Sequence, residues 1–322
     1  MGTDLVTGGA GFIGSSIVAR LVAAGRSVRV IDDLSTGDEA RLAPHRTRID
    51  LIRADLVTAD LAAILDGVER VFHLAAVPSV PRSVEDPFHS HQTSATATLR
   101  LLLAAREARV RRFVHSSSSS IYGDTPTLPK KEDMPLAPVS PYGIAKAAAE
   151  GYVRAFARLY GLHTVALRYF NVFGPTQDPT SGYAAVIPLF ISRALEGRPL
   201  LIFGDGRQTR DFTFVDNVVE ADLLAASADV PAGRAYNIAG GQPHSVLDLV
   251  AALERVLGRR LEVEHRPPRA GDIVHSYADV SAAKAELGWA ATIDFEEGLR
   301  RTVDWYRTHS SAALAGAARQ RA

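Results

Sequence analysis

The chain contains no cysteine. That absence excludes disulfide bonds, thiolate zinc sites and cysteine nucleophiles, and it fits the reducing cytoplasm. The 36 basic and 36 acidic residues balance to a formal charge of zero, which gives no support for nucleic acid or an anionic membrane as partner. No apolar run approaches the roughly 18 residues of a membrane span, and the first strand-like run begins too early to leave room for a signal peptide. We therefore expect a cytoplasmic protein that binds neither nucleic acid nor membrane.

The length indicates more than a minimal domain. At 322 residues the chain predicts one large domain with a substantial annex, or two domains that share a cleft. The apolar share of 47% and the charged share of 22% are ordinary for a soluble globular enzyme. His89 and His91 lie two positions apart after Pro87, but no third ligand follows at a recognisable spacing. We therefore expect surface histidines and no metal site.

A glycine turn near the N-terminus carries the first functional signal. The order of segments is strand at 5–7, glycine turn at 8–14, an amphipathic helical stretch from there to Ala24, strand at 28–31, and the acid Asp32. Gly8, Gly11 and Gly14 permit a tight turn and a close approach of backbone N–H groups to a pyrophosphate at the helix N-terminus, whose dipole favours anions. The alternative is that these glycines only allow a helix to pack closely on a sheet. The complete order of segments favours dinucleotide binding.

The acid that ends the second strand-like run indicates which dinucleotide binds. Asp32 stands about 20 residues after the glycine turn, where an acid reaches the ribose hydroxyl pair. A carboxylate there would repel a 2′-phosphate, and residues 34–36 offer no arginine beside it. The sequence therefore predicts NAD rather than NADP. Asp4, in the expected first strand, is a polar residue that the sequence does not explain.

The first half of the chain continues to alternate strand-like and helix-like segments. Further strands are expected at 49–55, 71–76 and 112–115, and a helix at 93–108. Asp55 and Leu56 would lie at the carboxyl end of the third strand near an adenine edge, although Asp55 could instead cap a helix. The pattern predicts an α/β protein with a Rossmann-type doubly wound parallel sheet and a smaller α/β C-terminal domain. We expect NAD binding by residues 1–170, a substrate-binding domain mainly at 171–309 with part of 211–240 returning to the sheet, and a flexible tail at 310–322.

A tyrosine and a lysine mark the candidate chemistry. Pro141 is suited to a first helical turn, so a helix is expected to begin there, and it places Tyr142 and Lys146 one turn apart on one face. A phenol titrates near ~10 unaided, but a nearby ammonium favours the phenolate and lowers the pKa of the phenol. Such a pair can act as a general base toward a substrate hydroxyl. The alternative is a chance pair on a solvated helix face.

These residues belong to a longer series of motifs. The series begins with the glycine turn and Asp32 and continues through Asp55-Leu56, His73-Leu74-Ala75-Ala76, Ser116 to Gly123, Tyr142-x-x-x-Lys146, Leu167 to Pro175, Phe203 to Gly206, Arg210 to Phe212, and Arg269-x-Gly271-Asp272. Over nearly its whole length to about Trp305, the chain thereby resembles the extended short-chain dehydrogenase/reductase family. Within that family it is most similar to the NAD-dependent nucleotide-sugar 4-epimerases.

The resemblance implies a role for each matching residue. Ser118 and Tyr142 would contact the sugar 4-hydroxyl with Tyr142 as the base, and Lys146 would hold the nicotinamide ribose. The residues expected at the NAD cofactor are Gly8, Gly11, Phe12, Ile13, Gly14, Asp32, Asp55, Leu56, Leu74, Ala75, Ala76, Tyr142, Lys146 and Tyr169. Those expected at the UDP-sugar are Ser79, Arg82, Ser118, Ser119, Ser120, Asn171, Val186, Phe203, Arg210, Arg269, Asp272 and Ser276. The resemblance also implies a homodimer formed through the helices at 93–108 and 146–160.

Two arginines and a phenylalanine of the second half can be weighed from their chemistry alone. Guanidinium forks match phosphate oxygens, so Arg210 and Arg269 could bind a diphosphate. Arginines are more often solvated or paired with carboxylates, and Phe203 could be ordinary core rather than a stacking partner for a base. The resemblance favours the binding roles, with Asn171 and Asp272 completing the site.

The residues after Ser118 separate the reactions of the family. Dehydratases that resemble this chain carry an acidic pair there, because a C5 proton must be removed and water expelled, and decarboxylases of UDP-glucuronate usually have a glutamate at the second place. Here both places are serines, Ser119 and Ser120. The resemblance therefore implies hydride removal from C4, rotation of the 4-keto sugar and return of the hydride.

The sugar follows from one small residue. Ser276 matches the family position that limits the pocket beside the sugar C2 substituent, so the resemblance implies room for an N-acetyl group, as in UDP-GlcNAc and UDP-GalNAc. UDP-Glc and UDP-Gal are further expected substrates. Ser276 could also be only a small residue in a packed turn. Ser94 stands where the family usually has asparagine. Because its side chain is shorter, we expect a hydrogen bond to the backbone near the active site to be lost or bridged by water. UDP-glucuronate 4-epimerisation, 4,6-dehydration and a non-catalytic NAD-binding sensor are the alternative functions.

Overall fold

The computed structural model describes residues 2–179, 185–268 and 274–319, with side chains to residue 309. The chain divides into two compact units. The first unit consists of Met1–Tyr169, Asp216–Ile238 and Asp279–Ala290, and the second consists of Phe170–Val215, Ala239–Ala278 and Ala291–Ala322. Each unit is described separately below.

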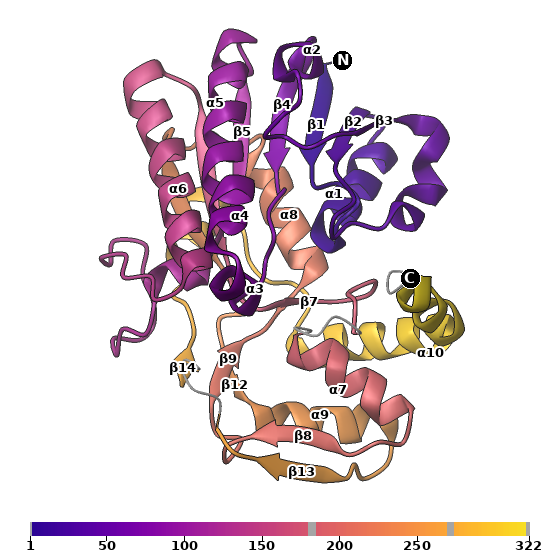
Figure 1. Ribbon diagram of the computed structural model, residues 1–322. Coiled ribbons are helices and arrows are strands. Elements are labelled where there is room, and N and C mark those ends of the chain that lie inside the picture. The colour runs from indigo at the N-terminus through magenta and orange to yellow at the C-terminus, as the bar shows by residue number, and fades with distance from the viewer. Residues whose placement is uncertain (1, 180–184, 269–273, 320–322) are drawn as a thin grey trace. The chain divides into compact units, whose positions relative to one another are not determined.

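A seven-stranded sheet forms the centre of the first unit, and every neighbouring pair of strands is parallel (Figure 1). The strand order is β11-β6-β5-β4-β1-β2-β3. The strands are β1 (Thr3–Thr7), β2 (Ser27–Asp32), β3 (Ile49–Arg53), β4 (Val68–His73), β5 (Arg112–Ser118), β6 (Thr164–Tyr169) and β11 (Arg234–Ile238). The predicted Rossmann-type fold is confirmed. The order reverses between β1 and β4, and ligands of such sheets bind beyond the carboxyl ends of the strands at that point.

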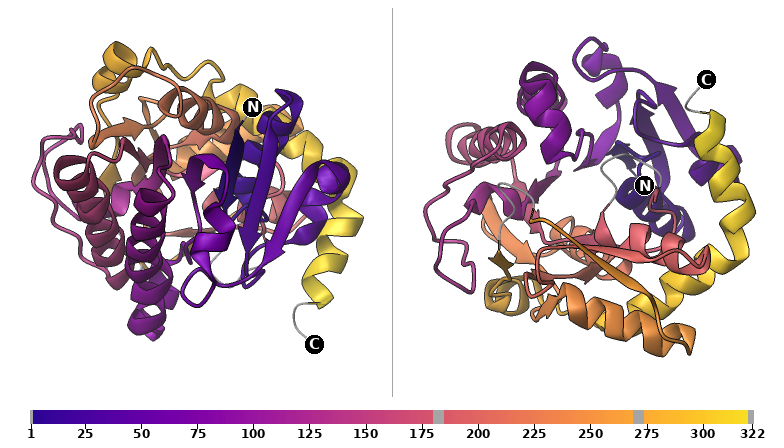
Figure 2. Two further views of the ribbon diagram at one scale, coloured as in Figure 1. Left: turned by 90° about the horizontal axis from the view of Figure 1, so that it is seen from above. Right: turned by 60° about the horizontal axis from the view of Figure 1, so that its bottom comes forward.

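Helices cover both faces of this sheet. On one face lie α1 (Phe12–Ala23) and α8 (Val215–Ala225), which are joined by an ion pair of 2.9 Å between Arg20 and Glu220. On the other face lie α2 (Leu61–Leu65), α5 (Ala97–Glu107) and α6 (Pro141–Tyr160), and α5 and α6 run side by side (Figures 1 and 2). Apolar residues at helical spacing, such as Leu101 and Leu102 of α5, are fully buried against the strands. Burial of these stripes on both faces explains why the strands are nearly continuous apolar runs.

Two arginines account for Asp4, the polar residue of the first strand. Asp4 is fully buried, and its carboxylate accepts paired hydrogen bonds from Arg26 and Arg70 at 2.6–2.9 Å. Arg26 also reaches Glu69 at 2.9 Å. A buried carboxylate is tolerated where it is paired and hydrogen-bonded. Asp4 therefore joins the amino ends of β1 and β4 to the turn that precedes β2.

A second buried ion pair lies between β6 and α6. Arg168 and Glu150 are both completely buried, and their side chains form two hydrogen bonds of 2.6 and 3.0 Å. Ser117 donates to the same carboxylate at 2.7 Å, and the Arg168 guanidinium donates to the Tyr122 hydroxyl at 2.6 Å. The Tyr122 hydroxyl in turn donates to Asn237 of β11 at 2.7 Å. The network therefore joins β5, β6, β11 and α6 below the serine run.

Two segments return to the first unit from later in the chain. We predicted a return within 211–240, and the structure places Asp216–Ile238 there, with β11 paired to β6. Residues 279–290, inside the range predicted to be mainly the second domain, also belong to the first unit. The reason is side-chain burial that the local pattern does not reveal, because Trp289 is 1% exposed and its indole donates to the Asn217 carbonyl at 2.8 Å.

The second unit contains short sheets and longer helices. Its strand pairs are β7 (Val172–Phe173) with β10 (Thr213–Phe214), β8 (Leu200–Phe203) with β13 (Val263–Arg266), and β9 (Thr209–Asp211) with β12 (Pro243–Ser245) and β14 (His275–Ser276). Its helices are α7 (Val186–Leu195), α9 (Val246–Leu257) and α10 (Phe295–Arg319). The backbone of α10 continues to Arg319, past the start of the expected tail at 310. Flexibility of 310–322 stays a prediction.

Short helices complete the described chain. They are η1 (Glu39–Arg48), α3 (Val80–Glu85), α4 (Pro87–His91), the π-helical turn η2 (Gln92–Thr96), η3 (Ser119–Tyr122) and the π-helical turn η4 (Ala283–Leu287). His89 and His91 lie in α4 rather than in a loop. Within the described ranges, no three histidine or acidic side chains gather as a metal site would require, and every helix is too short or too polar to cross a membrane.

We predict that Glu150→Gln lowers the free energy of unfolding of the first unit by about 3–5 kcal/mol, because it leaves the Arg168 charge buried without its counter-ion. Urea unfolding can be followed by the fluorescence of buried Trp289 in a Trp305→Phe background. Glu107→Gln is the matched control, since the Glu107 side chain is 71% exposed and its pair with Arg106 lies on the surface. The control variant should lower the free energy of unfolding by less than about 1 kcal/mol. An equal, small effect of both variants would contradict the prediction.

Candidate active site

The glycine turn between β1 and α1 forms a cradle with no room for side chains. Gly8 has φ of +67°, a conformation that residues with a Cβ rarely adopt, and a Cβ there would lie 2.8 Å from the Ala75 backbone nitrogen. A Cβ on Gly14 would overlap the Gly8 carbonyl oxygen. Helix α1 begins after Gly11 without a side-chain cap. Its first N–H groups therefore suit an anion, as the sequence predicted.

Asp32 closes one side of this turn. Its carboxylate accepts hydrogen bonds from the Ala10 N–H at 2.8 Å and the Leu34 N–H at 2.9 Å. Burial raises the pKa of Asp32, and the two backbone bonds act in the opposite direction. A Cβ on Gly37 would lie 2.7 Å from the Asp32 carboxylate, so the space beside this acid is kept open. The turn and the acid together fit the pyrophosphate and a ribose of a dinucleotide.

The other residues expected at the cofactor occupy two strand ends. The N–H groups of Leu74 and Ala75, which follow β4, both donate to the Thr7 hydroxyl at 3.2 Å. These bonds hold the small residues of that segment against the glycine turn. Asp55 is exposed, and its carboxylate accepts from the Val57 N–H at 2.8 Å within a turn. This bond resembles the capping role that was the alternative for Asp55. The contact of Asp55 with an adenine stays a prediction, and so do the cofactor contacts of Leu56 and Ala76.

Helix α6 positions the candidate base. Ser140 caps the helix, with its hydroxyl accepting from the Gly143 N–H at 3.1 Å, and Pro141 occupies the first turn. Lys146 is 3% exposed, and its ammonium donates to the Ser116 carbonyl at 2.8 Å. Burial lowers the pKa of Lys146 to about 8. The helix thus begins where the sequence predicted, and it brings Lys146 to the end of β5.

One electrostatic expectation is wrong for the chain by itself. We expected Lys146 to lower the pKa of the Tyr142 phenol, whereas burial raises that pKa, and only a hydrogen bond with Ser118 acts in the opposite direction. The physical reason is that the Lys146 ammonium is directed to the Ser116 carbonyl. Ser118 and Tyr142 are nevertheless brought together, as the two contacts to one sugar hydroxyl require.

Ser118 ends β5 and is the middle residue of the serine run, Ser116 to Ser120. Its hydroxyl oxygen accepts from the Ser120 N–H at 3.2 Å and from the Ser120 hydroxyl at 2.9 Å. Ser119 and Ser120 form the first turn of η3. All three side chains are partly exposed at the carboxyl end of the sheet, where a ligand is expected. The run therefore presents hydroxyl groups and no carboxylate beside Tyr142.

Two buried histidines lie near Lys146, and the sequence did not identify them as part of the site. His73 and His115 are paired in register on β4 and β5, with ring centroids 5.4 Å apart. Burial, together with the charge of Lys146, lowers the pKa of His73 to about 3 and that of His115 well below its usual value. Both rings are therefore neutral. Their places on two predicted strands, 71–76 and 112–115, were the one signal that could have revealed them.

The hydrogen bonds of His73 assign its tautomer. Thr7 Oγ1 lies 2.7 Å from Nδ1, and Thr98 Oγ1 lies 2.8 Å from Nε2. The Thr98 hydroxyl donates to the Ser94 carbonyl at 2.6 Å, so it accepts from His73, and the proton is placed on Nε2. Among the described residues, the buried hydroxyl of Ser94 has no hydrogen-bond partner. A buried polar group without a partner among the described residues therefore lies beside this network.

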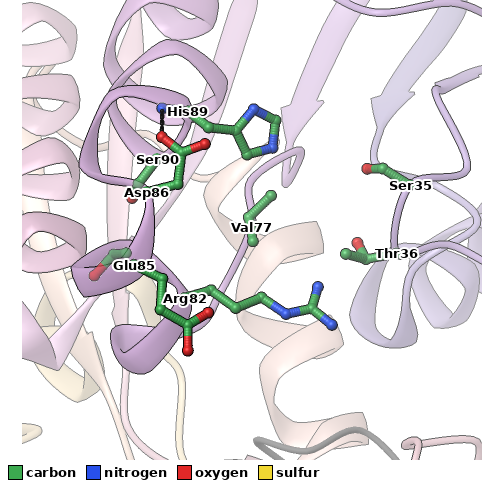
Figure 3. A pocket seen from close by; sticks show the side chains of 9 residues that line it. Ser35, Thr36, Val77, Arg82, Glu85, Asp86, His89 and Ser90 are labelled. Carbon is green, nitrogen blue, oxygen red and sulfur yellow. Dashed lines mark hydrogen bonds between the residues drawn. The ribbon is translucent and has the colours of Figure 1, made fainter.

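Of the predicted substrate residues, Ser79 caps helix α3 and Arg82 lies within it. The Ser79 hydroxyl accepts from the Arg82 N–H at 3.3 Å. Arg82 lines a cavity of about 320 Å³ with Ser35 and Thr36, which follow Asp32 in the chain. Figure 3 shows the Arg82 side chain extending across this cavity toward Thr36. The structure therefore brings Arg82 to the loop expected beside the cofactor ribose, and its sugar contact stays a prediction.

In the second unit, two of the predicted substrate residues face each other across a strand pair. Arg210 of β9 is in register with Ser276 of β14, and the adjacent Asp211 is fully buried. The Asp211 carboxylate accepts from the N–H groups of Gly241 at 3.0 Å and Ala278 at 3.2 Å. Burial raises the pKa of Asp211 to about 7, against these bonds. Asp211 thus holds the backbone beside both predicted residues, and sequence reasoning did not single it out.

The remaining predicted residues of the second unit lie on other segments or outside the described residues. Asn171 has φ of +31°, and its amide donates to the Asp211 carbonyl at 3.3 Å. Phe203 ends β8 and Val186 begins α7. Arg269 and Asp272 lie outside the described residues. The substrate roles of all of these residues stay predictions.

Comparisons with known proteins identify the family. The profile of the NAD dependent epimerase/dehydratase family matches residues 5–239. UDP-glucose 4-epimerase of Mycolicibacterium smegmatis is 42% identical over 311 residues, covering 95% of this chain and 99% of the relative. The chain therefore belongs to the NAD-dependent epimerase/dehydratase family. The resemblance to NAD-dependent nucleotide-sugar epimerases of the extended short-chain dehydrogenase/reductase type is confirmed, as is NAD as cofactor.

Solved structures agree with this assignment. UDP-N-acetylglucosamine 4-epimerase from Methanobrevibacter ruminantium, solved with UDP-N-acetylmuramic acid, superimposes with a TM-score of 0.92 at 42% identity and covers 96% of this chain and 99% of its own. UDP-glucuronic acid 4-epimerase from Bacillus cereus, solved with UDP-glucuronic acid and NAD, gives 0.89 at 31% identity and covers 95% and 99%. This chain is thus similar to two enzymes whose bound sugars differ in the substituents at C2 and C6.

We predict that Asp32→Ala weakens NADH binding by roughly 10- to 100-fold, the range expected when a hydrogen bond to a charged group is lost. It should also reduce the preference for NADH over NADPH, because the repulsion of a 2′-phosphate is removed. Titration of protein stripped of nucleotide, followed by dinucleotide fluorescence, measures both effects. Asp33→Ala is the matched control, because the adjacent Asp33 is exposed and bonds only locally to Ser35 in a turn. Equal loss in both variants would contradict the role of Asp32.

Proposed function

We propose that this chain is an NAD-dependent UDP-sugar 4-epimerase that interconverts UDP-GlcNAc and UDP-GalNAc, and UDP-Glc and UDP-Gal as well. The observation that carries the proposal is the group of Ser118, Tyr142 and Lys146 at the carboxyl end of β5, in the same parallel sheet whose strand β1 leads into the glycine turn. Membership of the epimerase family and similarity to UDP-sugar 4-epimerases over almost the whole chain support it. A cytoplasmic location follows as part of the same proposal.

The chain's own residues divide the work of the reaction. When bound, NAD would supply the hydride acceptor and donor for C4 of the sugar. Tyr142 accepts the proton of the 4-hydroxyl and later returns it, and Ser118 holds the same oxygen by a hydrogen bond. Lys146 would hold the nicotinamide ribose and would supply a positive charge near the phenol. That charge then favours the phenolate, which the isolated chain disfavours.

The serine run favours epimerisation over dehydration. Elimination of water across C5 and C6 requires an acid and a base beside the sugar, in addition to Tyr142. Ser119 and Ser120 occupy the places where dehydratases have carboxylates, and a serine hydroxyl is too weak an acid and base to replace them. Proton transfer is therefore limited to the 4-hydroxyl, which is sufficient for epimerisation.

The choice of sugar rests on Ser276. A serine at this place leaves room beside C2, so an N-acetyl group is accommodated. Its position opposite Arg210, the proposed diphosphate ligand, supports a place in the sugar pocket. UDP-glucuronate 4-epimerisation is the second candidate, because the chain is also similar to an enzyme of that activity.

The assembly is proposed from one helix face. On α6, Ile144, Tyr152, Leu159 and Tyr160 are large apolar or aromatic residues with exposed fractions of 40–68%. Helix α5 beside them exposes Leu103. Exposed apolar surface of this kind marks interaction sites. We propose that α5 and α6 form the interface of a homodimer.

We predict that the purified protein, without added cofactor, converts UDP-GlcNAc to UDP-GalNAc, because NAD stays bound and is regenerated in each cycle. UDP-GlcNAc, UDP-Glc and UDP-GlcA are incubated in parallel, and the anomeric proton signals are followed by NMR. Absence of an epimer in all three reactions would overturn the proposal and favour the non-catalytic sensor. A 4-keto-6-deoxy product would instead identify a dehydratase, and an epimer from UDP-GlcA alone would identify the second candidate.

Tyr142→Phe should lower kcat by at least about 100-fold, because it removes the proton acceptor. The content of bound NAD, measured after protein precipitation, should stay unchanged. Tyr152→Phe is the control on the same helix, since Tyr152 is exposed and lies away from the serine run. Full activity of Tyr142→Phe would show that another group is the base.

A further inference from the structure

Asp222 is a buried acid for which the proposed reaction has no use. It lies on α8, in the segment that returns to the first unit, and it is 1% exposed. Both of its carboxyl oxygens lie 2.8 Å from the hydroxyl oxygen of Tyr169. Tyr169 is the last residue of β6 and is 7% exposed. The structure therefore pairs a buried acid with a buried phenol at the carboxyl edge of the sheet.

The number of protons in this pair indicates how it is bonded. A phenol has one hydrogen to donate, so it cannot donate a full hydrogen bond to two carboxylate oxygens. A protonated carboxyl group resolves this, because one oxygen accepts from Tyr169 and the other donates to it. Burial raises the pKa of Asp222 to about 8, so the protonated form predominates at neutral pH. Asp222 and Tyr169 thus form a reciprocal pair in which both polar groups are satisfied.

This pair is connected to the catalytic residues by two routes. Tyr169 is in register with Ser118 on the neighbouring strand β5. The Tyr169 phenol also forms a hydrogen bond with the Ser116 side chain. The carbonyl of that same Ser116 accepts the Lys146 ammonium at 2.8 Å. A displacement of Tyr169 would therefore move the strand end that holds both Ser118 and Lys146.

We propose that Asp222 is a positioning residue for Lys146 and Ser118, which acts through its reciprocal hydrogen bonds with Tyr169. The inference rests on the proposed function for its kinetic consequence, because Lys146 must turn to the nicotinamide ribose and Ser118 must reach the sugar hydroxyl. It assigns no charge to Asp222 in the reaction. The pair instead fixes the distance between α8 and the ends of β5 and β6.

The experiment compares a change that removes the hydrogen bonds with one that keeps them. Asp222→Leu removes both, whereas Asp222→Asn can still accept through its oxygen and donate through its amide nitrogen. We expect Asp222→Leu and Tyr169→Phe each to lower kcat by about 10- to 100-fold, the effect of a small displacement of catalytic groups. KM for the UDP-sugar should stay within about threefold, and Asp222→Asn should stay within about threefold of the unchanged protein in both constants. The double variant Tyr169→Phe/Asp222→Leu should be no slower than the slower single variant, because both changes break one unit.

Two further measurements separate positioning from folding and from the choice of substrate. NADH affinity, read by fluorescence, requires no turnover, and it should fall about 5- to 10-fold in Asp222→Leu and Tyr169→Phe but not in Asp222→Asn, a loss of roughly one hydrogen bond. Glu220→Gln on the same helix is the control, since its pair with Arg20 is exposed, and it should change neither constant. If no sugar is turned over by the unchanged protein, the proposed function fails while the NADH measurement still tests Asp222.

Several results would overturn the inference. Wild-type kcat and NADH affinity in Asp222→Leu would show that Asp222 has no positioning role. Equal impairment of Asp222→Asn and Asp222→Leu would show that the negative charge matters rather than the reciprocal hydrogen bonds. Additive losses in the double variant would show that Asp222 does not act through Tyr169. If Asp222→Leu does not fold, Tyr169→Phe and Asp222→Asn carry the same comparison.

Discussion

The buried ion pair of Arg168 and Glu150 is the interaction on which the first unit most depends. Arg168 precedes Tyr169 at the end of β6, and Glu150 lies one turn beyond Lys146 on α6. Ser117, directly before Ser118, donates to the same carboxylate. Two charges without solvent are stable only if each stays close to the other and its remaining hydrogen-bonding groups are satisfied. The pair therefore fixes the distance of α6 from the strands that carry the serine run.

Electrostatics around Lys146 follow from this arrangement. The ammonium enters a region where His73 and His115 are neutral because they are buried, and the Ser116 carbonyl is its hydrogen-bond acceptor. Burial lowers the pKa of Lys146 to about 8, so the ammonium still predominates at neutral pH, and it raises the pKa of Tyr142, so the phenol stays neutral. The phenolate is therefore disfavoured until a ligand changes the environment. The site thus combines fixed positions with protonation states that depend on binding.

Much of the fold could be predicted because its signals are local. The glycine turn, the apolar strands and the helix that begins at Pro141 depend on residues within a few positions of one another, and the structure has each of them. The return of 279–290 to the first unit could not be predicted in this way. That segment belongs there because Trp289 is buried and bonds to Asn217, a contact between positions 72 residues apart. No periodic pattern within the segment indicates that partner.

For the candidate site, too, local features could be predicted from the sequence and contacts between distant residues could not. By itself the sequence determined which chemical groups are available: a phenol and an ammonium one helical turn apart, hydroxyl groups without acids at Ser119 and Ser120, and an acid after the second strand for a ribose. Only the tertiary structure decided where these groups point and what supports them. It directs Lys146 to Ser116, places Arg82 beside Thr36, and pairs Asp222 with Tyr169. The physical reason is that side-chain identity and spacing are properties of the chain, whereas burial and hydrogen-bond partners depend on which distant strands and helices become neighbours.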